Sequence, residues 1–172
     1  MGINRLNHAV LYVRDAERMA AFFVDVLGFE RLDAYRVPGG AFIRAGGSTN
    51  DHDLGLFSVG DAAAASPAGR GAVGLYHLAW EVDTLADLAA FARRLEEVGA
   101  LVGATDHGTT RALYAKDPDG LEFELTWIVP ADQLRPDDGP AMRPLDLSHD
   151  IERFGADTLG GVGISRPASA PA

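Results

Sequence analysis

The chain has 172 residues, of which 47% are hydrophobic and 23% are charged, as expected for one soluble globular domain. Its formal net charge of −10 argues against nucleic acid and anionic membrane surfaces as partners, because both are bound by basic surfaces. The absence of Cys excludes disulfides, thiolate metal sites and Cys nucleophiles, so any metal must be held by His and carboxylate side chains.

The first half of the chain predicts a strand, a helix and three further strands. NHAVLYV (7–13) is rich in β-forming residues. DAERMAAFFVDVLG (15–28) has apolar residues at helical spacing, with Asp15 suited to the N-cap and Gly28 to the C-terminus. Three strands are then predicted at FERLDAYRV (29–37), GAFIRAG (40–46) and DLGLFSV (53–59), with Pro and Gly between them. The predicted order is therefore βαβββ.

The second half repeats this order. LNHAVLYVRDAERMAAFF (6–23) aligns without a gap with LYHLAWEVDTLADLAAFA (75–92) at an offset of 69, which puts His8 in register with His77. A helix is predicted over 84–99, with Thr84 as its cap and Gly99 at its end. Strands follow at ALVGATDH (100–107), TRALYAKD (110–117) and LEFELTWI (121–128), and the DPDG sequence at 117–120 is interpreted as a turn only.

These patterns predict an α+β fold organised as one domain over residues 1–128. Module one is expected at 3–60, a connector at 61–73 and module two at 74–128. Residues 129–172 are expected to form a C-terminal extension that is partly disordered, with a short helix in LSHDIERF (147–154) and a frayed tail in SRPASAPA.

Polar residues on three of the predicted strands are candidate metal ligands. Because side chains alternate along a strand, Glu124 lies on the face opposite Leu125 and Trp127. If equivalent strands carry their helices on the same side, His8, His77 and Glu124 project from the opposite, concave faces. Two His and one carboxylate suit Fe(II) with open positions, and Zn²⁺ accepts the same set with a bound water. A single His on a strand is usually packed or hydrogen-bonded, but the repeat register favours the metal interpretation for the three together.

The chain resembles the vicinal oxygen chelate superfamily over residues 3–128. The resemblance is carried by the paired βαβββ pattern, by the two His in register and by DPDGLEFEL, which is similar to the DPxGxxxEL ending of that family. It implies two modules that form a cupped mixed sheet around a metal, with helices outside and with His8, His77 and Glu124 as the ligands. Glyoxalase-like members carry a fourth ligand on the last strand of module one. In this sequence the offset puts Gly55 there, and Asp53 is two residues out of register.

Three more residues make the chain most similar to the type I extradiol dioxygenases of that superfamily, which cleave catecholic rings with O₂. They are His52, His107 and Tyr114, the last lying ten residues before Glu124. The resemblance implies His52 as a catalytic acid or base that stabilises the oxygen species, with Tyr114 and His107 hydrogen-bonded to the substrate. It also implies Fe(II), or Mn(II) in its place, and a catecholic substrate with O₂. Taken singly, these residues have plainer interpretations as an exposed loop His, a turn His and a packed Tyr.

Two other classes of function stay open. One is a glyoxalase-like isomerase or epimerase, or a thiol transferase of the fosfomycin-resistance kind, each with a divalent metal. The other is a non-catalytic binding protein of the bleomycin-resistance kind, which needs no metal ligands. Candidate pocket residues are Phe42, Phe57, Trp80 and Trp127, and His149 is interpreted as a surface residue.

Location and assembly are predicted from simpler features. No apolar run is long enough to span a bilayer, and MGINRLNHAV lacks the apolar core of a signal peptide, so a cytoplasmic location is expected. Exposed sheet edges favour a homodimer or a higher homo-oligomer. A dioxygenase of this kind is expected to serve aromatic compound catabolism.

Overall fold

The structure is a computed structural model that describes residues 2–3, 5–69, 71–136 and 138–160. The predicted SRPASAPA tail lies outside these residues. The chain divides into two compact units. The first contains Met1–Pro67 and Asp117–Leu121, and the second contains Ala68–Lys116 and Glu122–Ala172. No helix in the described part of the chain has the length and apolar character needed to cross a membrane.

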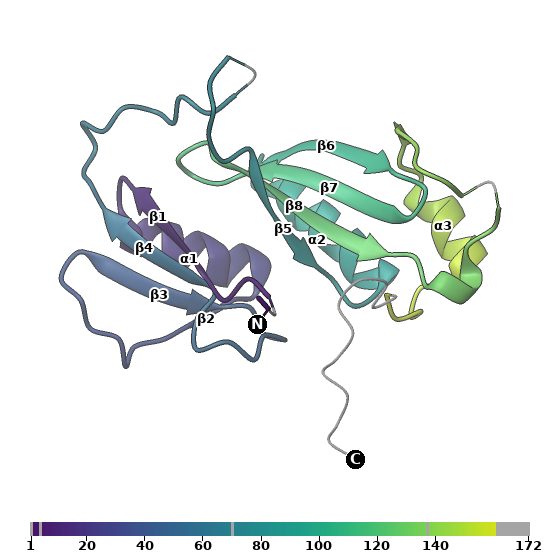
Figure 1. The fold of residues 1–172 in the computed structure, drawn as a ribbon, viewed down its shortest axis with the longest axis horizontal. Helices are drawn as coiled ribbons and strands as arrows, with labels where there is room; N and C mark the ends of the chain where they lie inside the picture. The colour runs from purple at the N-terminus through teal and green to yellow at the C-terminus, as the bar shows by residue number, and fades with distance from the viewer. Residues whose placement is uncertain (1, 4, 70, 137, 161–172) are drawn as a thin grey trace. The chain divides into compact units, whose positions relative to one another are not determined.

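Each unit has the predicted βαβββ order (Figure 1), so the α+β prediction is confirmed. The elements of the first unit are β1 (Ala9–Val13), α1 (Ala16–Leu27), β2 (Glu30–Arg31), β3 (Gly40–Arg44) and β4 (Leu54–Ser58). Those of the second are β5 (His77–Glu81), α2 (Leu85–Glu97), β6 (Leu101–Asp106), β7 (Thr110–Lys116) and β8 (Glu122–Ile128).

The sheet of the first unit has four strands in the order β1-β4-β3-β2, with β1 and β4 parallel and the other pairs antiparallel. α1 covers one face of this sheet, and the core between them is formed by apolar side chains such as Met19, Phe23, Ile43, Leu54 and Leu56, all almost fully buried. Burial of these side chains is the main stabilising contribution to the unit. The residues that alternate with them on the strands lie on the opposite face of the sheet.

The helices begin and end where capping chemistry predicts. The Asp15 carboxylate accepts hydrogen bonds from the backbone N–H groups of Glu17 and Arg18, and Gly28 ends α1 in the left-handed conformation at φ 73°. Thr84 caps α2 by accepting from the Asp87 amide, and Gly99 follows that helix with φ 68°. Both predicted pairs of cap and stop residues are therefore confirmed.

The sheet of the second unit has five strands in the order β5-β8-β7-β6-β9. Along β8 the side chains alternate, so that Phe123, Leu125 and Trp127 are buried while Glu122, Glu124 and Thr126 are only partly covered. The alternation predicted for this strand is confirmed, and it puts Glu124 on the face away from α2.

The C-terminal extension contributes ordered elements to the second unit. They are a short 3₁₀ helix (Ala131–Gln133), β9 (Arg143–Pro144), which pairs with β6, and α3 (Leu147–Phe154), which confirms the predicted short helix. A buried ion pair joins α3 to the sheet, because the Arg111 Nε atom of β7 lies 2.7 Å from the Asp150 Oδ2 atom. The described residues of the extension, 129–136 and 138–160, are thus built into the second unit rather than set apart from it.

One predicted strand is largely wrong. Of residues 29–37 only Glu30–Arg31 forms a strand, β2. The chain then turns, with the Tyr35 amide donating to the Leu32 carbonyl at 3.2 Å, and Gly39 adopts a left-handed φ of 71° before β3. Local turn formation therefore outweighs the β-propensity of this segment.

Candidate metal centre

In the first unit, His8 and His52 lie against each other. His8 precedes β1 and is exposed, and its ring centroid is 4.5 Å from that of His52, which precedes β4. The His8 Nδ1 atom lies 2.7 Å from the Asn7 side-chain oxygen, which accepts, so Nδ1 carries the proton in the neutral ring. The Nε2 atom of His8 then has the free lone pair that a metal ion requires.

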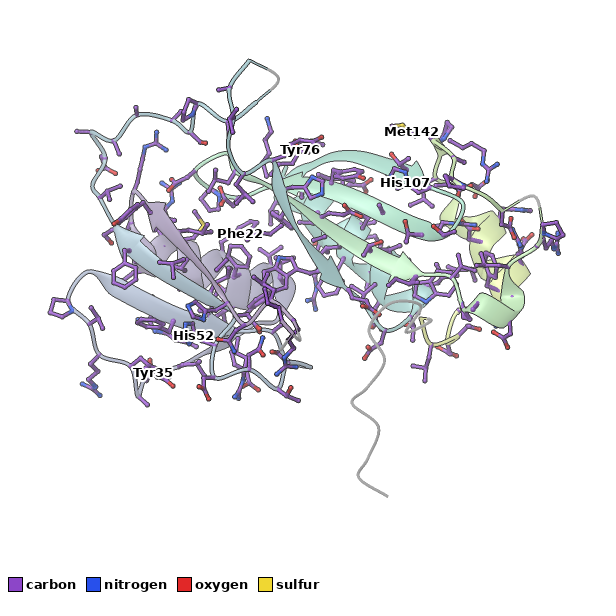
Figure 2. The ribbon with its side chains drawn as sticks, viewed as in Figure 1. Phe22, Tyr35, His52, Tyr76, His107 and Met142 are labelled. Atoms are coloured by element: carbon purple, nitrogen blue, oxygen red, sulfur yellow. The ribbon has the colours of Figure 1, made fainter. Side chains whose placement is uncertain are left out.

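His52 is half-buried among aromatic rings. Phe42 meets it edge-on at 5.1 Å between ring centroids, and Tyr35 lies 6.0 Å away, on the same side of the unit in Figure 2. Its Nδ1 atom is buried and has no hydrogen-bond partner among the described residues. An unpaired buried nitrogen costs stability, so this atom has a hydrogen-bonding capacity that the described residues leave unused. The burial of His52 does not fit an exposed loop residue.

The first unit has no carboxylate at the position equivalent to Glu124. Gly55 lies opposite Val10 on β1 and Phe42 on β3, and a Cβ at Gly55 would be 3.4 Å from the Phe42 ring. The neighbouring acid, Asp53, is buried and accepts hydrogen bonds from the Ala45 amide, the Ser48 hydroxyl and the Asn50 side chain. Asp53 therefore braces the loop before β4.

In the second unit, His77 and Glu124 form a pair on adjacent strands. The Nε2 atom of His77 lies 3.1 Å from the Oε2 atom of Glu124. Both side chains are mostly covered, and the His77 Nδ1 atom is buried without a partner in the described part of the chain. Two ligand atoms that are each about 2.1 Å from one metal ion, at a right angle, are about 3 Å apart. The donor types and the spacing of this pair therefore fit a divalent cation.

His107 and Tyr114 lie next to that pair. Tyr114 on β7 faces Glu124 on β8, and its ring centroid is 5.7 Å from that of His77. The Tyr114 hydroxyl is 2.8 Å from the Nε2 atom of His107. Burial, and then the negative charge of Glu124, raises the pKa of Tyr114 to about 12. Tyr114 is therefore a neutral hydroxyl at physiological pH and can donate a hydrogen bond.

The predicted ligand trio is divided between the two units. His8 belongs to the first unit, whereas His77 and Glu124 belong to the second. Within residues 2–3, 5–69, 71–136 and 138–160, no group of three or more His, Asp or Glu is arranged to hold a metal ion. The trio therefore stays a prediction, and each unit by itself supplies only part of a ligand set.

The remaining sequence predictions have mixed outcomes. Trp127 is not a pocket residue, because its side chain is fully buried in the core and its indole N–H donates to the Thr158 carbonyl. His149 is exposed on α3, as predicted. The DPDG segment is more than a turn, because Asp119 accepts a hydrogen bond from the Arg14 amide at 2.7 Å within the first unit.

Two contributors near the candidate centre were missed from the sequence. The sequence predicts Tyr35 in a strand, whereas its place beside Phe42 depends on the turn at residues 32–35. The Ala141 carbonyl lies 3.2 Å from the Nδ1 atom of His107, and a backbone carbonyl leaves no signal in a sequence. His52, by contrast, is implied by the family resemblance.

Comparison with known families identifies the fold class. Residues 5–125 match the sequence model of the Glyoxalase/Bleomycin resistance protein/Dioxygenase superfamily. This match covers more than half of the chain and extends from the segment before β1 into β8, across both βαβββ units. The chain therefore belongs to that superfamily.

The chain is also similar to individual proteins of known name. The chain is 32% identical over 120 residues to the catechol-2,3-dioxygenase of Bacillus subtilis (strain 168), covering 70% of this chain and 40% of that protein. It is 28% identical over 131 residues to the manganese-dependent 2,3-dihydroxybiphenyl 1,2-dioxygenase of Geobacillus genomosp. 3, covering 74% of this chain and 38% of that protein. The lactoylglutathione lyase of Agrobacterium tumefaciens matches the fold with a TM-score of 0.54 and 26% identity, covering 73% of this chain and 95% of that one. The chain thus spans well under half the length of these two curated dioxygenases.

Proposed function

We propose that this chain is a metal-dependent extradiol dioxygenase that cleaves a catecholic ring beside its vicinal diol with O₂. The proposal is carried by one observation, the contact of Tyr114 with both His107 and the His77–Glu124 pair. An isomerase or thiol transferase has no need of a hydroxyl and a second His beside its metal ligands. The similarity to two dioxygenases supports the same assignment.

We assign the metal to His8, His77 and Glu124, with Fe(II) as the first choice and Mn(II) as the second. When bound, the metal would bring the diol and O₂ together and carry electrons between them. A fourth protein ligand is not expected, because Gly55 has no side chain and Asp53 is occupied by its own hydrogen bonds. With no further protein ligand, a metal held by these three side chains would keep positions open for the diol and O₂.

The proposed roles of the other residues follow from their contacts. The Tyr114 hydroxyl would hold one diol oxygen of the substrate, and His107 fixes the direction of that hydroxyl. The buried, unpaired Nδ1 atom of His52 would hold or move a proton during ring opening. Phe42 and Tyr35, which flank His52, would exclude water from that side. Both atoms of O₂ enter the product, so the reaction needs no external reductant.

The test is anaerobic loading of the protein with Fe(II) or with Mn(II), followed by addition of O₂ and a panel of catechols. We expect one O₂ to be consumed per catechol, together with the yellow absorbance of a ring-opened semialdehyde. Metal binding without O₂ uptake, and without a charge-transfer band when catechol is added anaerobically, would favour the isomerase or transferase alternative. Failure to bind either metal would favour the non-catalytic binding protein.

A further inference from the structure

His107 is held on both sides of its ring. Its Nε2 atom lies 2.8 Å from the Tyr114 hydroxyl, and its Nδ1 atom lies 3.2 Å from the carbonyl oxygen of Ala141 in the C-terminal extension. The backbone N–H of Ala141 in turn donates to the His107 carbonyl at 3.1 Å. Met142 directly follows Ala141 in the chain, and Figure 2 shows His107 beside the segment that carries Met142. Ala141 therefore contacts both the backbone and the ring of His107.

These contacts define the tautomer of His107. A carbonyl oxygen can only accept a hydrogen bond, so the Nδ1 atom must carry the proton. In the neutral ring the Nε2 atom is then an acceptor, and the Tyr114 O–H donates to it. The lone pairs of the Tyr114 oxygen are left to accept a hydrogen bond from a substrate hydroxyl. Without the Ala141 contact, His107 could instead carry its proton on Nε2. It would then donate to the Tyr114 oxygen, and the direction of that hydrogen bond would be reversed.

The segment that presents Ala141 is fixed by charge pairs on either side. Asp138 is paired with Arg153 of α3, with 3.0 Å between Oδ1 and NH1, and Arg143 of β9 is paired with Asp106 of β6 at 3.0 Å. Asp138 is buried, and its hydrogen bonds with Arg153 outweigh the effect of burial, so the pKa of its carboxyl lies well below the ordinary value. The charge pair at Asp138 therefore persists throughout the neutral pH range.

Close backbone packing also fixes the segment against the turn after His107. Gly108 has a left-handed φ of 82° and is buried, and any Cβ there would collide with the carbonyl oxygen of Gly139. Gly99 has a similar φ of 68° with open space around it. Of these two glycines, Gly108 is the one at which a neighbouring segment requires the absence of a side chain.

We propose that residues 138–143 of the C-terminal extension are a positioning element for His107, which they hold as the Nδ1–H tautomer so that Tyr114 accepts from the substrate. The use of that tautomer in ring cleavage rests on the proposed dioxygenase function, whereas the tautomer itself does not. In this arrangement the extension contributes to the candidate active site through the backbone carbonyl of Ala141.

The direct test is ¹⁵N NMR of the histidine rings in the full-length, metal-free protein at about pH 8.5, where a His with the usual pKa of about 6.5 is neutral. A His107→Asn variant identifies the His107 signals. We expect a protonated Nδ1 and an unprotonated Nε2 in the wild-type ring. A wild-type His107 protonated at Nε2 would overturn the proposal by itself.

The variants test whether the segment causes this preference. Asp138→Asn removes the charge that holds Arg153, and Asp132→Asn is its matched control, an exposed acid of the same extension outside these contacts. We expect mixed tautomers of His107 in the first variant only. Gly108→Ala should displace residues 138–141 and give the same result, whereas Gly99→Ala adds a similar backbone strain without a neighbour. A His107 tautomer that is unchanged in both Asp138→Asn and Gly108→Ala would also overturn the proposal.

Turnover separates this proposal from the dioxygenase assignment. If the protein cleaves catechols, turnover in Asp138→Asn should fall roughly tenfold with catechol binding little changed, because the variant loses orientation rather than a binding contact. If no catechol is cleaved, the tautomer measurements still decide whether the extension positions His107. The dioxygenase function would then fail alone.

Discussion

β4 and β8 hold the same position in the two units, each parallel to the first strand of its unit and antiparallel to the strand before it. On β4, Gly55 lies between Val10 and Phe42, and on β8, Glu124 lies between Ala79 and Tyr114. The same backbone position therefore carries no side chain in one unit and a carboxylate in the other.

This difference extends to the surrounding residues. The first unit has two imidazoles, tilted against each other with 4.5 Å between ring centroids, beside the aromatic rings of Phe42 and Tyr35. The second has an imidazole–carboxylate pair beside a phenol and another imidazole, and a C-terminal extension braces it. Two copies of one fold can thus carry different functional groups. Strand pairing depends on the backbone, whereas the chemistry of the exposed face depends on a few side chains.

The largest effect is expected from the first unit. Replacement His52→Phe should leave metal and catechol binding intact but lower turnover by about 10²–10⁴-fold, the usual contribution of a general acid or base. Turnover per bound metal is the measurement, and His149→Phe, at an exposed His, is the control. Equal turnover in the two variants would return His52 to a structural role.

The second unit should depend on its extension for stability. Asp150→Ala leaves the buried Arg111 without one of its two acidic partners, and breaking a buried pair costs roughly 3–5 kcal/mol. We expect the free energy of unfolding, measured in urea, to fall by about 3 kcal/mol, because Asp106 still faces Arg111. Asp157→Ala, at an exposed acid of the same segment, should have little effect. A similar loss in both variants would contradict the role of the pair.

Metal affinity should depend on which carboxylate of β8 is removed. Glu124→Gln should weaken Fe(II) or Mn(II) binding at least about 100-fold, since loss of even an outer partner of a ligand typically costs 10–100-fold. Glu122→Gln is the matched control, because it makes the same change two residues away on the same face. Titration of the metal-free protein gives both affinities. An equal loss in the two would mean that general negative charge, rather than coordination, holds the metal.

The smallest effect is expected when the first unit is given the carboxylate that it lacks. Gly55→Glu puts a carboxylate at the position equivalent to Glu124, and we expect metal binding to be retained while O₂ uptake falls roughly tenfold or more, because an open coordination position is filled. Gly55→Gln introduces the same bulk beside Phe42 without the charge. If the Gln variant loses as much activity as the Glu variant, crowding of Phe42 is the cause.

Much of the fold was predictable because its signals are local. Apolar spacing and the caps Asp15 and Thr84 define the two helices, and alternation along 121–128 defines the exposed face of β8. The segment at 29–37 was not predictable in this way. Its β-forming residues are outweighed by a turn that closes at Tyr35.

The candidate site was predictable only in its residue types and register. The offset between the halves brought out His8, His77 and the lack of an acid at Gly55, and the family resemblance added His52, His107 and Tyr114. The hydrogen-bond partners of Asp53 and Trp127 were not predictable. Their partners, the loop at 45–50 and the carbonyl of Thr158, depend on how the folded chain packs.

The sequence by itself determined the two βαβββ modules, their capped helices and the strands that carry or directly follow each candidate ligand, because periodicity and capping act within a few residues. The tertiary structure alone decided that Nε2 of His77 meets Glu124, that Tyr114 bonds to His107 and that Ala141 holds the other nitrogen of His107. These contacts join different segments of the second unit, and one of them uses a backbone carbonyl. Distances of this kind are set by sheet register and by packing of the extension, which no local pattern encodes.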